Sequence, residues 1–172
     1  MTKQEPEIRI YAACLASYNS GILHGRWIDV RQDIETIRHE IKSMLKESPV
    51  AGAQEYAIHN YEGFEGAPIE EHQNIESITE IAEFIAEYRA LGGKLIEYYA
   101  NLEDAKTAME EDYAGAYAYV ADFAQELTEE TTEIPQNLQY YIDYERMAHD
   151  LEINDVLSIE TGFKEVHLFW RR

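Results

Sequence analysis

The stretch Leu102–Glu133, "LEDAKTAMEEDYAGAYAYVADFAQELTEETTE", holds ten acidic residues and one lysine around a block of tyrosines and alanines. Asn101 precedes it and is a good N-cap, so a helix is predicted to begin directly after that residue. The middle, "DYAGAYAYV", carries its tyrosines at odd-numbered positions and is predicted to be extended. A helix is predicted to resume over Val120 to Glu129. This stretch therefore predicts a helix, an extended segment and a second helix, with much uncompensated charge.

The N-terminal part predicts strands and one well-capped helix. Residues 8–17, 26–30 and 55–60 are rich in β-branched and aromatic residues and are predicted strands. Asp33 is a good N-cap for a helix that runs to about Lys46. Its apolar residues recur at helical spacing: Ile34, Ile37, Ile41 and Leu45. Together these elements predict a small αβ unit.

The central part reads as a linker followed by helices. Residues 61–73, "YEGFEGAPIEEHQ", contain the Gly and Pro typical of a connection. A helix is predicted from Ile75 to Leu91, because Gly92-Gly93 is the usual signal for a helix end. A shorter helix is predicted from Leu95 to Ala100.

The C-terminal part predicts one more helix and a hairpin. Pro135 is expected to open a helix that spans roughly Gln136 to His149. The sequence "VLSIETGFKEVHLFW" (156–170) is predicted to form two strands joined through Thr161-Gly162.

This order of elements is typical of an α+β protein. We expect an elongated chain of three small lobes. They are an N-terminal antiparallel sheet with a helix at residues 1–61, an acidic helical lobe at 62–103, and C-terminal helices with a β-hairpin at 104–172.

The net charge of −20 is concentrated in one region of the chain. Residues 1–54 carry seven acids and seven bases, whereas residues 55–133 carry twenty acids and three bases. Residues 134–172 carry seven acids and four bases. A protein adapted to high salt is expected to spread its acids over the whole surface. The concentration of acids in residues 55–133 therefore favours a specific partner.

Known catalytic and metal-binding patterns are absent from the sequence. It has no glycine-rich phosphate loop, no nucleophile elbow and no zinc-protease motif. The six histidines show no ligand spacing, and the EF-hand pattern is missing. Neighbouring glutamates on exposed segments lack the cleft that would shift their pKa values for acid–base work. We expect no catalytic residue, no metal and no cofactor, so the protein is not expected to be an enzyme.

Membranes and nucleic acids are also excluded as partners. No apolar run approaches the roughly 20 residues that span a bilayer. Contacts to phosphates need Lys and Arg, of which residues 55–133 hold only three. Cys14 is the only cysteine, so no intrachain disulfide can form, and a cytoplasmic location is expected.

The glutamates of the predicted central helix share one face without lysine between them. Glu76, Glu80, Glu83 and Glu87 recur at helical spacing. Like-charge pairs four residues apart destabilise a helix by about 0.2–0.5 kcal/mol each, so the pattern needs a compensating use. One such stripe gives one charge per ~5.5 Å, which is sparser than the one per ~1.7 Å of duplex DNA. Only several stripes on an extended body, doubled in a dimer, would approach that density.

Four blocks of the sequence resemble the ArdA family of antirestriction proteins. They are "IYAACLASYNSGILHGRWIDV" (10–30), "EYAIHNYEGF" (55–64), "DYAGAYAYVADFAQEL" (112–127) and "YIDYERMAHDLEI" (141–153). Their order and near full-length coverage make the resemblance specific. It implies an elongated homodimer of three-lobed chains, carried on a mobile genetic element, that mimics bent B-DNA. It further implies that the mimic occupies the DNA-binding groove of type I restriction–modification enzymes.

The resemblance places the mimic surface on the carboxylates between residues 62 and 133. The predicted set is Glu62, Glu65, Glu70, Glu71, Glu76, Glu80, Glu83, Glu87, Glu97, Glu103, Asp104, Glu110, Glu111, Asp112, Asp122, Glu126, Glu129, Glu130 and Glu133. Tyr113 and Tyr117 are predicted dimer contacts, with burial in the core of the monomer as an equal alternative. Other readings remain open: an acidic mimic of DNA aimed at another DNA-binding protein, an acidic enzyme dependent on a divalent metal, or a structural protein with an acidic face.

Overall fold

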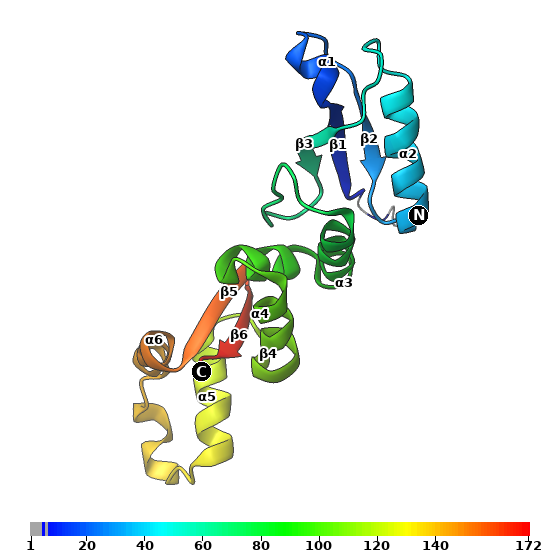
Figure 1. The fold of residues 1–172 in the computed structure, drawn as a ribbon. Helices are drawn as coiled ribbons and strands as arrows, with labels where there is room; N and C mark the ends of the chain where they lie inside the picture. The colour runs from blue at the N-terminus through cyan, green and yellow to red at the C-terminus, as the bar shows by residue number, and fades with distance from the viewer. Residues whose placement is uncertain (1–4, 6) are drawn as a thin grey trace. The chain divides into compact units, whose positions relative to one another are not determined.

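The computed structural model describes residue 5 and residues 7–172, and it divides into two units, residues 1–97 and 98–172 (Figure 1). Each unit contains its own three-stranded antiparallel sheet with helices beside it. The predicted α+β class is confirmed. The division into three lobes and the elongated form stay predictions.

The first unit is built around the strand β1. β1 (Arg9–Cys14) lies between β2 (Gly25–Asp29) and β3 (Tyr56–Glu62). A short helix, α1 (Leu15–Asn19), follows β1, and α2 (Ile34–Lys46) packs on the β1 and β2 strands. The core contains fully buried side chains from the strands and α2: Ile8, Ile10, Ile28, Ile37 and Met44.

Capping chemistry sets the start of α2 as predicted. The Asp33 side chain accepts a hydrogen bond from the backbone N–H of Thr36 at 3.0 Å and one from its hydroxyl at 2.6 Å. These bonds satisfy a donor that the first helical turn leaves free. They also lower the pKa of Asp33, because they favour its charged form. The predicted first strand is too long, since residues 15–17 turn into α1.

The predicted end of the central helix is wrong. α3 (Ile75–Tyr99) consists of two helical segments that meet at a kink at Arg89, whose φ is 55°. Gly92 and Gly93 lie buried inside the second segment, which includes the predicted short helix. A Cβ on Gly93 would lie 2.2 Å from the backbone oxygen of Glu65. Gly93 therefore permits close packing of the Glu65 loop on the helix, and the two glycines do not end it.

The second unit places β6 at the centre of its sheet. β6 (Glu165–Trp170) lies between β4 (Tyr113–Tyr117) and β5 (Val156–Gly162). α4 (Leu102–Thr107) runs into a π-helical turn, η1 (Ala108–Asp112). α5 (Val120–Thr131) and α6 (Tyr144–Asn154) pack against each other beside the sheet (Figure 1). The extended prediction for 113–117 and the cap at Asn101 are confirmed.

The core of the second unit joins α5 to the sheet. Phe123 of α5 is buried with Val156, Val166 and Leu168 of β5 and β6. Tyr117 and Leu127 pack against this cluster while remaining partly exposed. The buried face of α5 is therefore fixed, and its other positions are left to solvent.

Two C-terminal predictions are corrected. The predicted helix over 136–149 is a 3₁₀ helix, η2 (Gln136–Tyr141), followed by the separate helix α6. Asp143 caps α6, because its side chain accepts from the backbone N–H of Arg146 at 3.0 Å. The strands β5 and β6 are joined by a turn at residues 163–164, two residues beyond the predicted Thr161-Gly162, with Lys164 at φ 53°.

Candidate acidic interface

The first segment of α3 carries the predicted row of glutamates on its exposed side. Glu76, Glu80, Glu83 and Glu87 are exposed. The opposite side is buried and apolar, with Ile78, Ile81, Ala82, Phe84 and Ile85. Between residues 75 and 88 the helix has no lysine or arginine. The apolar side thus fixes the rotation of the helix, and the carboxylates follow along the solvent face.

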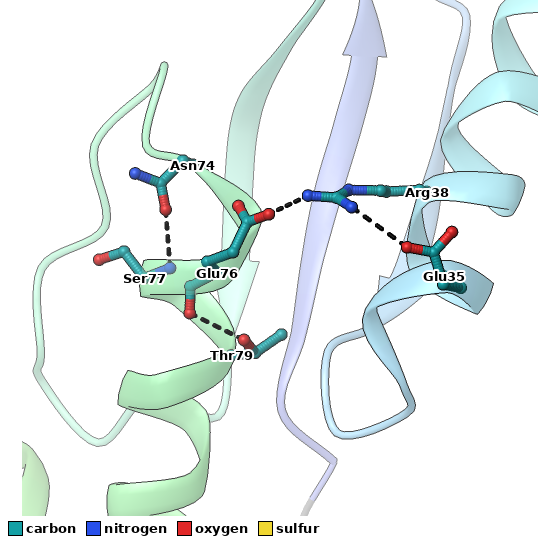
Figure 2. Close-up of polar contacts among 6 residues, drawn as sticks. All are labelled: Glu35, Arg38, Asn74, Glu76, Ser77 and Thr79. Carbon is teal, nitrogen blue, oxygen red and sulfur yellow. Dashed lines mark hydrogen bonds and ion pairs between the residues drawn. The ribbon is translucent and has the colours of Figure 1, made fainter.

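The start of α3 is tied to α2 through Glu76 (Figure 2). Arg38 of α2 forms ion pairs with Glu76 and, at 3.2 Å, with Glu35. Asn74 accepts a hydrogen bond from the backbone N–H of Ser77 at 2.7 Å and so caps the helix. Glu76 is therefore the member of the row that already has a cationic partner.

Carboxylates outside the α3 row complete the predicted acidic residues of the first unit. Glu62 pairs with Arg9 at 2.7 Å, and Glu71 lies 3.6 Å from His59. The remaining predicted residues of this unit are exposed without an ion pair among the described residues: Glu65, Glu70 and Glu97.

The acids of α4 and η1 divide between exposure and burial. Glu103, Asp104, Glu110 and Glu111 are exposed. Asp112 is 9% exposed, and its carboxylate accepts from Arg172 Nε at 2.7 Å, while Arg172 also pairs with Glu111. These bonds raise the pKa of Arg172. The prediction of Asp112 as a surface carboxylate is wrong, because a cation from the far end of the sequence holds it at the protein interior.

α5 is the most uniformly acidic helix of the second unit. It presents Asp122, Glu126, Glu129 and Glu130 to solvent, and Glu133 follows it. The helix contains no lysine or arginine. Within the described residues none of these five carboxylates forms an ion pair; Asp122 instead accepts the Tyr119 backbone N–H at 3.2 Å.

The electrostatics of α5 reach a neighbouring tyrosine. Burial raises the pKa of Tyr117, and the negative charges of Glu126 and Glu130 raise it further. Both effects disfavour the phenolate. The α5 carboxylates therefore act as uncompensated negative charge on the groups around them.

The predicted dimer contacts have different environments. Tyr117 packs edge-on against Phe123 at a centroid distance of 5.3 Å and belongs to the core of the second unit. Tyr113 is 38% exposed, and its hydroxyl lies 2.8 Å from His167 Nδ1. A dimer role for either residue stays a prediction.

Sequence reasoning missed two features of this surface. Arg172, from the sequence end, neutralises Asp112 and Glu111, which no local pattern indicates. Tyr140 of η2 is 93% exposed and lines a hollow beside the C-terminal end of the acidic α5, which no sequence pattern indicates.

Two structural features bear on metal ligation and membrane insertion in the described part of the chain: groups of metal-ligating side chains and membrane-spanning helices. No group of three or more His, Cys, Asp or Glu side chains among residues 5 and 7–172 is arranged to hold a metal ion. Across the same residues, no helix combines the length and the apolar character needed to cross a bilayer.

The fold and the exposed carboxylates define an acidic α+β protein with rows of unneutralised charge on its helices. The comparison with protein families is more specific, because the model of the antirestriction protein ArdA matches residues 10–165. The chain belongs to the ArdA family, a family of non-catalytic antirestriction inhibitors, and the resemblance of its sequence blocks is confirmed. No curated protein matches the chain.

Proposed function

We propose that this protein inhibits type I restriction–modification enzymes by acting as a mimic of B-DNA. As a homodimer it occupies the DNA-binding groove of the specificity and modification subunits. Its carboxylates take the places of DNA phosphates, so no nucleic acid and no cofactor take part. Membership of the ArdA family supports the antirestriction part of this proposal.

The observation that carries the proposal is the exposure of acidic rows on rigid helices. Eighteen of the nineteen predicted carboxylates are exposed, and only Asp112 is buried. Five of the nineteen lie in ion pairs within the described residues: Glu62, Glu71, Glu76, Glu111 and Asp112. Most of the charge thus remains available to a partner.

The helices supply charge at useful density. Glu76 to Glu87 span eleven residues of α3, or about 16 Å. In α5, four acids lie between Asp122 and Glu130, which gives about one carboxylate per 4 Å. Each row is sparser than the phosphates of a duplex, so the proposal requires several rows to act together.

A basic groove would recognise such rows for the same reason that it recognises DNA. Lysine and arginine side chains placed to neutralise phosphates attract any rigid array of anions, and long-range attraction speeds the encounter. The packed apolar side of each helix fixes the backbone that carries the carboxylates, so little backbone ordering is left for the moment of binding.

The test is competition for the DNA site of a purified type I methyltransferase. A fluorescent duplex containing the recognition sequence is displaced by the protein, and displacement is measured at several duplex concentrations. We expect the apparent affinity of the protein to fall in proportion as the duplex concentration rises. Displacement that does not depend on duplex concentration, or no displacement at all, contradicts the proposal.

A control with an unrelated DNA-binding protein tests whether the inhibition is specific to type I enzymes. The same assay is run with an unrelated bacterial DNA-binding protein and its own duplex. We expect much weaker displacement there. Equal displacement from both would favour mimicry directed at DNA-binding proteins in general.

A further inference from the structure

A hollow of about 440 Å³ lies beside the C-terminal end of α5, within the second unit. We name it the α5–η2 pocket. The residues that matter for its chemistry are Glu129, Glu133, Thr132, Ile134, Tyr140 and Tyr144. It therefore combines two carboxylates, two phenol rings and an apolar side chain.

The charges at this pocket favour a cation. Neither Glu129 nor Glu133 forms an ion pair in the described part of the chain, and no lysine or arginine lines the pocket. Thr132 is the C-cap of α5, so the last carbonyl groups of the helix lie at this end. A helix C-terminus carries partial negative charge and normally has basic residues in its last turn, whereas α5 has none.

The tyrosines add a surface on which a cation can stack. Tyr140 is 93% exposed, and within residues 5 and 7–172 its ring makes no aromatic or cation–π contact. Tyr144 lines the same hollow and is partly buried. Cations are attracted to the faces of aromatic rings, and the attraction grows when water is excluded.

Two other acidic hollows contain a lysine or arginine of the chain itself. In the second unit, the hollow lined by Asp104 and Asp112 also holds Arg171 and Arg172. In the first unit, the hollow beside Glu76 holds Arg38 and Lys42. The α5–η2 pocket also contains two carboxylates, but no lysine or arginine lines it. It differs from both other hollows in this respect.

We infer that the α5–η2 pocket receives an arginine side chain of the partner enzyme. A guanidinium group is planar, so it can stack on Tyr140 while its N–H groups donate to Glu129 and Glu133. This inference rests on the proposed function, since the basic groove of a DNA-binding enzyme supplies the arginine. It assigns binding energy to one place on a surface whose charge is otherwise widely spread.

The consequence is a hot spot at a residue that carries no charge. Interfaces concentrate their energy in a few residues, among which tyrosine and arginine are enriched. Removal of the Tyr140 ring is therefore expected to cost more than the loss of an average carboxylate.

Neighbouring residues provide matched controls for the ring. Tyr140→Ala is expected to weaken binding to the type I methyltransferase about tenfold, and Tyr140→Phe less than about twofold, because the ring is kept. Tyr141→Ala removes an exposed ring from the same 3₁₀ helix outside the pocket and is expected to leave binding unchanged. Equal effects of Tyr140→Ala and Tyr141→Ala overturn the inference.

The carboxylates allow the same comparison. Glu129 lines the pocket, whereas Glu130 is exposed on the same helix and does not line it. Glu130→Gln measures the general effect of one lost charge. Glu129→Gln is expected to exceed it by about threefold or more, because that carboxylate accepts directly from the guanidinium. Equal affinities of the two variants would show that Glu129 contributes only to the general negative charge of the surface, which contradicts the inference.

A titration of the full-length protein separates this inference from the proposed function. N-acetyl-arginine methylamide is added while backbone amide signals are followed by NMR. We expect saturable shifts at Thr132, Ile134 and Tyr144 that are lost in Tyr140→Ala. Shifts spread over all acidic segments without saturation overturn the inference, even if the protein displaces DNA. Saturable shifts at these three residues support the arginine site. If the protein nevertheless fails to displace the duplex from the methyltransferase, the proposed function is contradicted.

Discussion

The helices α2 and α5 are built by the same rules and differ in what they show to solvent. Each buries an apolar side against its own sheet. α2 carries two glutamates, two lysines and one arginine, and Arg38 pairs with Glu35 and Glu76. α5 carries four acids and no base. The contrast shows that this chain can make a helix with balanced charge, so the imbalance of α5 is not a requirement of the fold.

The imbalance has a cost that α2 does not carry. Like charges at Asp122/Glu126 and Glu126/Glu130 lie four residues apart, a spacing that destabilises a helix by about 0.2–0.5 kcal/mol for each pair. Burial of Phe123 and Ala124 offsets this cost. Under the proposed function, the acids are kept for binding, whereas stability alone would favour mixed signs.

Charge reversal is the strongest way to break this comparison. Glu126, Glu129 and Glu130 of α5 are changed together to lysine. We expect binding to the type I methyltransferase to fall by about 100-fold or more, the range over which charged surfaces alter association rates. Competition with a fluorescent duplex measures the change.

The matched variant makes an equal change of net charge around α2. Glu35, Glu40 and Glu47 are changed to lysine, and binding is expected to weaken by less than about fivefold, because none of the three belongs to the predicted interface and salt screens charges that do not touch the partner. Circular dichroism confirms that both variants remain folded. Similar losses in the two variants would show that net charge, rather than its position, controls binding.

The internal ion pairs predict a smaller effect, on stability. Arg172→Ala leaves the buried Asp112 carboxylate without its cation, so the Tm is expected to fall by roughly 3–8 °C. Arg38→Ala removes an exposed pair and is expected to lower the Tm by less than about 3 °C. Scanning calorimetry of both variants tests the difference. An equal or reversed order would mean that the Arg172 pair has no special structural role.

The pKa values of two tyrosines respond to the opposite charges near α2 and α5. Burial raises the pKa of Tyr56, and the positive charge of Arg38 partly opposes the rise. Burial also raises the pKa of Tyr117, to which Glu126 adds. Arg38→Ala is therefore expected to raise the pKa of Tyr56, and Glu126→Gln to lower that of Tyr117. NMR titration of the tyrosine ring carbons measures both values.

These pKa shifts determine how the stability of the folded state changes with pH. A tyrosine whose pKa is higher in the folded state adds stability below its unfolded pKa, near 10.0. That contribution is lost as pH rises through the folded pKa. Both Tyr56 and Tyr117 are thus expected to favour unfolding at strongly alkaline pH. Movement of the two pKa values in the same direction would contradict the contrast between the regions.

Local chemistry made part of the fold predictable. Asp33 and Asn101 marked the beginnings of α2 and α4, because a cap acts on backbone groups three residues away. The helix end predicted at Gly92-Gly93 is wrong, since the need for glycine at position 93 comes from the Glu65 backbone, which is distant in the sequence. The cap at Asp143 was not predicted, because apolar residues recur at helical spacing on both sides of it.

The site was predictable to the extent that it is periodic. Helical spacing placed Glu76, Glu80, Glu83 and Glu87 of α3 on one face, and all four are exposed. Burial of Asp112 was not predictable, because Arg172 lies sixty residues further along the chain. The α5–η2 pocket was not predictable either, since it depends on how η2 lies beside the end of α5.

The salt dependence of binding tests the central claim most directly. The affinity of the protein for a type I methyltransferase is measured between about 50 and about 200 mM KCl, where phosphate recognition changes steeply. We expect the affinity to fall at least about tenfold, and the α5 reversal variant to show a clearly shallower dependence. An affinity that is the same at both salt concentrations would contradict recognition through carboxylates in place of phosphates.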